Sequence, residues 1–79
     1  MMYILDLLNK IKWDQNLNPE EYTIIYFDRI SNTKKEIKFN KIKEFNNLTL
    51  ILNTKEKEIE IPLHRIREVK KGGKIIWKR

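Results

Sequence analysis

The chain has 79 residues and a formal net charge of +6, from 17 lysines and arginines against 11 aspartates and glutamates. A chain of this length buries only about 60% of its unfolded surface, which excludes a large internal active site, a nucleotide-binding α/β domain and a second core. It contains no cysteine, which excludes disulfides and thiolate metal sites, and its 41% hydrophobic content argues against disorder. We therefore expect residues 1–79 to fold as a single domain.

The beginning of the chain is apolar but short. Residues 1–11 fall below the roughly 18 apolar residues that cross a bilayer, and Asp6, Asn9 and Lys10 interrupt them. They also lack the basic start and the small-residue cleavage site of a signal peptide. We expect a cytoplasmic protein with no membrane partner.

The first predicted element is an amphipathic helix over residues 3–12. Four apolar residues recur at the i, i+3, i+4, i+7 spacing: Ile4, Leu7, Leu8 and Ile11. Trp13 falls opposite this stripe, so we expect the helix to end near it and the indole to turn toward the core or toward a ligand. Residues 16–19 have the composition of a loop.

The next two elements form a predicted hairpin. Residues 22–27 are β-branched and aromatic on both faces, which suits a central strand. A polar turn follows at residues 31–34, and residues 36–39 alternate as a half-buried strand does. Beyond it, Ile42 and Phe45 are three residues apart, which fits a single helical turn or an irregular apolar plug.

The second half of the chain predicts further strands. Residues 48–52 place their leucines on one face, and residues 58–61 alternate isoleucine with glutamate up to Pro62, which removes a backbone donor. Gly72 and Gly73 then separate residues 67–71 from 74–78 and predict a two-residue hairpin.

In this hairpin we expect Lys71 to face Lys74, Val69 to pair with Ile76, Arg67 with Lys78, Glu68 with Trp77 and Ile66 with Arg79. The predicted fold class is α+β, with one N-terminal helix packed on a curled antiparallel sheet of about five to six strands that ends in this hairpin.

The net charge is concentrated at one end of the sequence. Residues 1–60 hold ten basic and ten acidic side chains, whereas residues 61–79 carry Glu68 against seven cations: Arg65, Arg67, Lys70, Lys71, Lys74, Lys78 and Arg79. A basic segment of this kind fits a partner with phosphates. It fits equally well a solvated hairpin whose lysines prevent edge-to-edge aggregation.

The polar residues limit the chemistry. His64 is the only histidine, and there is no nucleophile elbow, glycine-rich phosphate loop or ligand spacing of carboxylates, so we expect no metal and no cofactor. His64 adjoins Arg65, and the pair could contact a phosphate or simply bond within the fold. Arg29 follows Asp28, and we favour an Asp28–Arg29 pair that orients a turn over a ligand contact.

Four segments recur together in the order of a known family: Leu-Asn-Lys-Ile-Lys-Trp-Asp at 8–14, Tyr-Phe-Asp-Arg at 26–29, Ile-Pro-Leu-His-Arg-Ile at 61–66 and Gly-Lys-Ile-Ile-Trp-Lys-Arg at 73–79. They resemble the RNA cyclic group end recognition domain, a small and mostly archaeal family. The resemblance implies a non-catalytic module that binds RNA ends bearing a 2′,3′-cyclic phosphate. The chain departs from the family pattern at Lys78, where an acidic or other polar residue is usual, and at Ser31 and Asn32, which replace a glycine.

The charge and the resemblance together predict an RNA-binding surface. Its predicted RNA- or phosphate-binding residues are Arg29, His64, Arg65, Arg67, Lys70, Lys71, Lys74, Trp77, Lys78 and Arg79, with Asp28 as an orienting residue and Trp13, Tyr26 and Trp77 as candidates for base stacking. The predicted partners are RNA and proteins of RNA processing or RNA repair. Two alternatives stay open, a phosphoesterase or nuclease that uses His64 with Arg29 or Arg65, and a basic adaptor in an RNA-processing assembly.

Overall fold

The computed structural model describes residues 3–79, which form one α-helix, three 3₁₀ helices and seven strands. In chain order these are α1 (Ile4–Trp13), η1 (Pro19–Glu21), β1 (Tyr22–Asp28), β2 (Thr33–Lys38), η2 (Phe39–Lys41), β3 (Ile42–Phe45), β4 (Thr49–Asn53), β5 (Glu58–Pro62), η3 (Leu63–Arg65), β6 (Ile66–Lys71) and β7 (Lys74–Lys78). None of the helices in this part of the chain has the length and apolar content needed to cross a bilayer.

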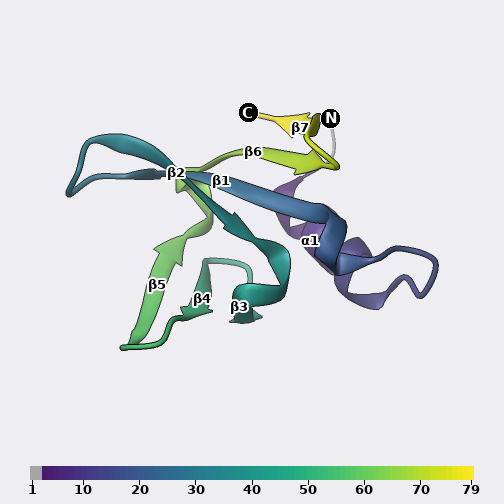
Figure 1. Cartoon of the computed structure of the whole chain (residues 1–79), viewed down its shortest axis with the longest axis horizontal. Helices are drawn as coiled ribbons and strands as arrows, with labels where there is room; N and C mark the ends of the chain where they lie inside the picture. The colour runs from purple at the N-terminus through teal and green to yellow at the C-terminus, as the bar shows by residue number, and fades with distance from the viewer. Residues whose placement is uncertain (1–2) are drawn as a thin grey trace.

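The seven strands form two antiparallel sheets, so the prediction of a single curled sheet is wrong. One sheet has the order β2-β1-β6-β7 and the other the order β3-β4-β5. The chain passes from the second sheet back to the first through η3, and β6 then pairs with β1 (Figure 1). The prediction that residues 22–27 form a central strand is confirmed, because β1 lies between β2 and β6.

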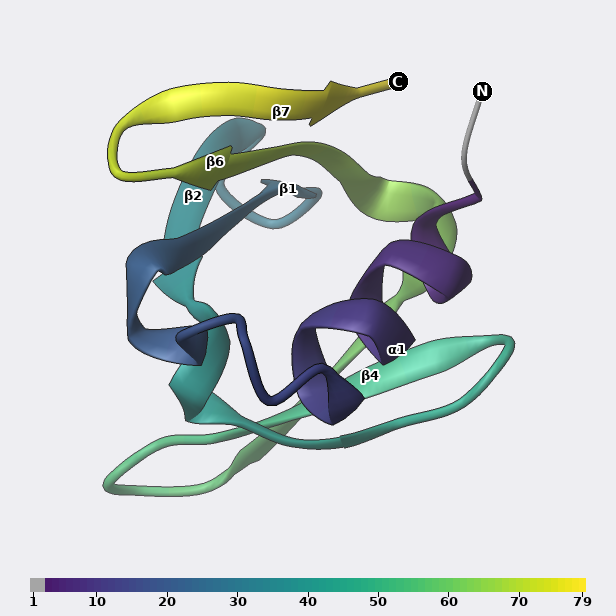
Figure 2. The same ribbon diagram turned by 90° about the vertical axis from the view of Figure 1, so that its right-hand side faces the viewer.

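Helix α1 fills the space between the two sheets. Figure 2 shows it between the β6–β7 hairpin above and β4 below. The four residues of the predicted apolar stripe, Ile4, Leu7, Leu8 and Ile11, are all buried, which confirms the helix. Leu8 and Ile11 are fully buried, and a fully buried side chain of this size contributes about 1.5–3 kcal/mol relative to exposure. The core therefore depends on α1, whose buried side chains form one cluster with residues of both sheets.

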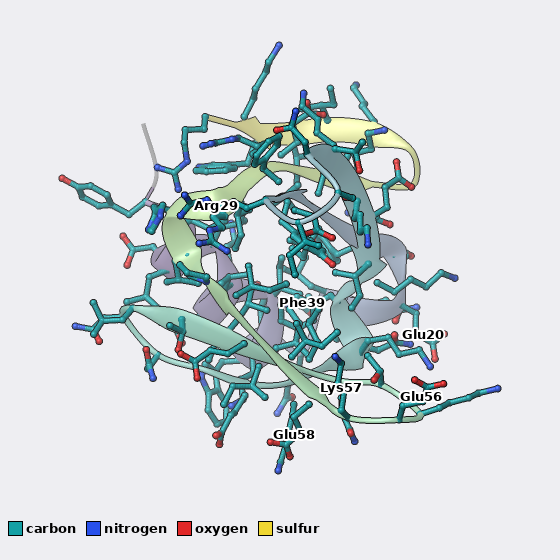
Figure 3. The ribbon with its side chains drawn as sticks, turned by 90° about the vertical axis from the view of Figure 1, so that its left-hand side faces the viewer. Glu20, Arg29, Phe39, Glu56, Lys57 and Glu58 are labelled. Carbon is teal, nitrogen blue, oxygen red and sulfur yellow. The ribbon has the colours of Figure 1, made fainter. Side chains whose placement is uncertain are left out.

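The interior is completed by apolar side chains from both sheets: Tyr22, Ile24, Leu50, Leu52, Ile61, Ile66, Val69 and Trp77. Phe39, from the 3₁₀ turn η2, projects into the middle of this interior in Figure 3 and packs edge-on against Phe45 with ring centroids 6.5 Å apart. Trp13 is not part of it, because 71% of its surface is exposed at the end of α1.

Strands β6 and β7 are joined by two residues with positive φ, Gly72 at +58° and Gly73 at +84°. Lys71 lies opposite Lys74, but the register shifts between Val69 and Lys70, so Val69 pairs with Trp77 and Glu68 with Lys78. The predicted pairs beyond the turn, Val69 with Ile76 and Glu68 with Trp77 among them, are therefore wrong. The bulge moves the indole of Trp77 to the core face of the hairpin and leaves Ile76 outside.

Ile42 and Phe45 belong to strand β3, not to a helical turn or an irregular plug. The register of β3 against β4 shifts between Ile42 and Glu44, where Ile42 lies opposite Leu52 and Glu44 opposite Ile51. A bulge adds one residue to a strand, so residues three apart can share a face. Ile42 and Phe45 are half-buried, while the two residues between them are exposed.

Candidate nucleic-acid interface

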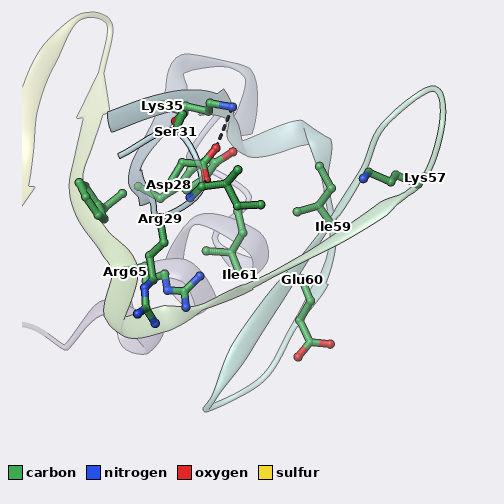
Figure 4. A pocket seen from close by; sticks show the side chains of 12 residues that line it. Asp28, Arg29, Ser31, Lys35, Lys57, Ile59, Glu60, Ile61 and Arg65 are labelled. Carbon is green, nitrogen blue, oxygen red and sulfur yellow. Dashed lines mark hydrogen bonds and ion pairs between the residues drawn. The ribbon is translucent and has the colours of Figure 1, made fainter. Parts of the chain in front are cut away.

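A cleft of about 370 Å³ lies where the turn between β1 and β2 faces β5 and η3. We call it the arginine cleft (Figure 4). Its lining residues are Tyr26, Phe27, Asp28, Arg29, Ile30, Ser31, Lys35, Lys57, Ile59, Glu60, Ile61 and Arg65. The residues come from both sheets and from the 3₁₀ turn that joins them, so the cleft exists only in the folded domain.

Asp28 fixes the turn that carries Arg29. Its carboxylate accepts a hydrogen bond of 2.9 Å from the backbone N–H of Ile30 and lies 2.8 Å from the Nζ atom of Lys35. The hydrogen bond from Lys35, followed by the one from Ile30, holds the pKa of Asp28 below its ordinary value. Asp28 therefore orients the turn, but with Lys35 as its cation in place of the predicted Arg29.

Arg29 and Arg65 converge in the arginine cleft although they are 36 positions apart in the sequence. Figure 4 shows both guanidinium groups near the η3 end of the cleft. Neither side chain makes a hydrogen bond or an ion pair with another residue in the 3–79 range, and the Nε atom of Arg65 is inaccessible to solvent without a partner. Because arginine does not deprotonate in proteins, the cleft holds two uncompensated charges that suit an anion.

The rest of the arginine cleft combines apolar and polar groups. Ile59 and Ile61 contribute apolar surface from β5. The phenol of Tyr26 is a hydrogen-bond donor at neutral pH, and burial raises its pKa further above the ordinary value of 10.0. Glu60 points away from the guanidinium groups in Figure 4, so its carboxylate does not neutralise them there.

A second cleft, of about 470 Å³, lies on another side of η3. We call it the histidine cleft, and its lining residues are Tyr3, Ile4, Leu5, Asp6, Asn47, Leu48, Leu63, His64 and Arg79. The guanidinium of Arg79 is fixed here, because Nε donates to the carbonyl of Ile66 at 3.0 Å and Nη2 to the carbonyl of Leu63 at 3.2 Å. His64 and Arg65 are neighbours in the sequence but line different clefts.

The family model of the MJ1316 RNA cyclic group end recognition domain matches residues 1–79. The chain belongs to this family. A UPF0248 protein of Saccharolobus islandicus is 37% identical to the chain over 81 residues, and the alignment covers 99% of the chain and 100% of the relative. A UPF0248 protein of Metallosphaera sedula is 33% identical over 78 residues, covering 99% and 94%. No solved structure matches the chain.

Membership of the cyclic group end recognition family confirms the resemblance drawn from the four sequence segments. The name of the family specifies RNA as the partner of its domain. The structure adds the location of the predicted residues, which the name does not give. Four of them, Tyr26, Asp28, Arg29 and Arg65, share one cleft, and two others, His64 and Arg79, share the second.

The other basic residues that were predicted to bind RNA lie on β6 and β7. Arg67 donates through Nη1 to the carbonyl of His64 at 3.1 Å, and the Nζ atom of Lys70 lies 3.6 Å from Glu36. Lys71 lies over the ring of Tyr22, 5.8 Å from its centroid, and Lys74 and Lys78 are exposed. At about 3.3 Å per residue along a strand, Lys71 lies roughly 20 Å from Arg65. The basic segment is therefore divided between two ends of the sheet.

The three predicted stacking residues occupy different environments. Tyr26 lines the arginine cleft. Trp77 is only 8% exposed in the core, which leaves little of its ring for a base. Trp13 is exposed, and the Nζ atom of Lys12 lies 5.0 Å from the centroid of its ring.

Sequence reasoning missed several lining residues. Ile30 is 99% exposed at the tip of the β1–β2 turn, and Lys57 reaches the arginine cleft from the turn before β5. Tyr3 and Leu48 were missed in the histidine cleft. The sequence offered one signal for these residues, Ile30, because an isoleucine lies inside a polar turn where glycine, asparagine or serine is usual. Within residues 3–79, no three His, Asp or Glu side chains are grouped as metal ligands would be.

Proposed function

We propose that this domain binds the 3′ end of RNA bearing a 2′,3′-cyclic phosphate, and that the arginine cleft receives the phosphate. The convergence of Arg29 and Arg65, which lack partners among residues 3–79, is the observation that carries this proposal. Guanidinium groups bind phosphate oxygens through paired, charge-assisted hydrogen bonds. The family name, which specifies RNA cyclic group ends, supports the same ligand.

The apolar part of the cleft favours the cyclic form of the end. A cyclic phosphate carries a single negative charge, whereas a terminal monophosphate carries between about 1.5 and 2 at neutral pH. The lower charge loses less hydration free energy beside Ile59 and Ile61. The phenol of Tyr26 adds a neutral donor for a phosphate or ribose oxygen.

The arrangement supports binding without cleavage. His64, the only histidine, lines the histidine cleft and not the arginine cleft. A general acid or base must lie within hydrogen-bond reach of the group it protonates or deprotonates. This geometry therefore disfavours a nuclease mechanism in which His64 and Arg65 act on the same phosphate.

The test is a titration of one short RNA sequence prepared with a cyclic phosphate, an open 3′-phosphate or a 3′-hydroxyl, followed by fluorescence anisotropy at two salt concentrations. We expect the cyclic end to bind most tightly. Arg29→Ala and Arg65→Ala should each weaken that complex about tenfold, the effect of losing one charged hydrogen bond, and should leave the hydroxyl-ended RNA unaffected. Lys41→Ala, which removes one exposed cation from η2 outside both clefts, is the matched control.

Equal affinity for the three ends would rule out end recognition. Absence of binding even at low salt, where contacts with phosphates are strongest, would rule out RNA as the partner.

A further inference from the structure

The 3₁₀ turn η3 directs its three side chains into three different environments. A 3₁₀ helix has three residues per turn, so consecutive side chains point about 120° apart. Leu63 is buried in the core, His64 lines the histidine cleft and Arg65 lines the arginine cleft. The two clefts are thus connected through neighbouring residues of one short turn.

The histidine cleft contains apolar and polar groups that can contact a nucleotide. Tyr3 and Leu48 line it with 79% and 71% of their surfaces exposed, and large exposed apolar side chains of this kind stack on or pack against bases. Asp6 and Asn47 can bond to the edge of a base, since a carboxylate accepts from exocyclic amines and an amide both donates and accepts.

Two groups of this cleft that can bind a phosphate, the guanidinium of Arg79 and the imidazole of His64, lie beside η3. Arg79 is held rigidly by two backbone carbonyls, one of which belongs to Leu63 of η3 itself. Its Nη1 atom has no bond to another described residue. His64 is exposed beside it. A phosphate that crosses η3 between the two clefts would meet the guanidinium of Arg79 and the imidazole of His64, while a base would enter among the apolar groups.

We propose that the histidine cleft is a second subsite, which binds the nucleotide preceding the RNA end, with His64 and Arg79 on the phosphate that links the last two nucleotides. This inference rests on the proposed function, since the arginine cleft then holds the end itself. The domain would accordingly recognise a dinucleotide and not an isolated terminal phosphate.

The experiment compares a ribonucleoside 2′,3′-cyclic phosphate with the di- and trinucleotides that end in it. We expect the dinucleotide to bind at least about fivefold more tightly than the mononucleotide, the lower end of the stacking contribution of one base. The trinucleotide should add little. His64 provides a direct readout, because its imidazole signals are the only ones of their kind in an NMR spectrum. They should shift with the dinucleotide and stay in place with the mononucleotide.

Leu48→Ser separates the two subsites, with Ile75→Ser as the matched control. Both residues are large, exposed and apolar, and Ile75 lies on β7 outside both clefts. We expect Leu48→Ser to lose the gain from the second nucleotide and keep the affinity for the mononucleotide, and Ile75→Ser to change neither. Equal binding of mono- and dinucleotide by the parent protein would overturn the second subsite alone. Failure of the parent to prefer any cyclic end would overturn the proposed function and this inference together.

Discussion

Replacing Arg65 by methionine is expected to stabilise the free protein and to weaken its complex with RNA. Methionine retains the aliphatic part of the side chain, while the Nε atom, which is inaccessible and unbonded among residues 3–79, is removed. A buried donor without a partner costs about 1–3 kcal/mol. Because the rest of the Arg65 side chain is partly exposed, we take the lower end, about 1 kcal/mol. In a domain of 60–100 residues this raises Tm by about 4–8 °C.

The assay is thermal unfolding by circular dichroism, with and without RNA that ends in a cyclic phosphate. A ligand that binds the folded state raises Tm, so Arg65→Met should begin from a higher Tm than the parent and gain less from RNA. Arg67→Met is the matched control, because Arg67 does have a partner, the carbonyl of His64 at 3.1 Å. It should lose about 1 kcal/mol. If Arg65→Met lowers Tm as much as Arg67→Met does, Arg65 stabilises the free protein, and the reasoning that its unbonded Nε atom destabilises the fold is refuted.

Three further substitutions test the fold and its pH dependence. Since the folded-state pKa of Asp28 is lowered, its ionised carboxylate stabilises the fold above the ordinary value of 3.8, and this contribution disappears as the pH falls through the folded pKa. Asp28→Asn should therefore flatten the acid side of a plot of urea midpoint against pH, and an unchanged slope would contradict this. Leu8→Ala, at a fully buried position between the sheets, should lower the free energy of unfolding by about 2–5 kcal/mol in urea titrations, and a loss under about 1 kcal/mol would show that the helix packs elsewhere. Gly73→Ala should cost about 1–2 kcal/mol, because its φ of +84° strains an L-residue although no atom lies within 4 Å of the added Cβ, and a thermal scan with an unchanged Tm would exclude that turn geometry.

The elements that the sequence predicts well are those specified by nearby residues. The stripe from Ile4 to Ile11 defines a helix by its own spacing, and its burial follows from amphipathicity alone. The strand over residues 22–27 is recognisable in the same way, since its aromatic and β-branched residues leave no face for solvent. Neither prediction requires knowledge of a distant partner.

Bulges account for the local errors. In β3 the extra residue makes Ile42 and Phe45 share a face at a spacing of three, which imitates a helical turn. In the hairpin of β6 and β7 the shift near Val69 exchanges the expected positions of Ile76 and Trp77. A bulge arises from how two strands fit together, so one strand's sequence gives no sign of it.

The candidate site shows the same limit at longer range. The sequence singled out Arg29 and Arg65 as separate residues, one in a turn and one beside a histidine. Their convergence depends on the division into two sheets, because the chain returns from β5 to the first sheet through η3. The opposite error was to group His64 with Arg65, since adjacency in the sequence brings side chains together only when the backbone conformation allows it.

The single peptide bond between His64 and Arg65 has an evolutionary consequence. One inserted or deleted residue in η3 would turn the following side chain by about a third of a turn and remove Arg65 from its position beside Arg29. Substitutions can alter either residue separately, but a change of length alters both clefts at once. We therefore expect members of this family to vary in the length of their outer hairpins while keeping the number of residues between β5 and β6 constant.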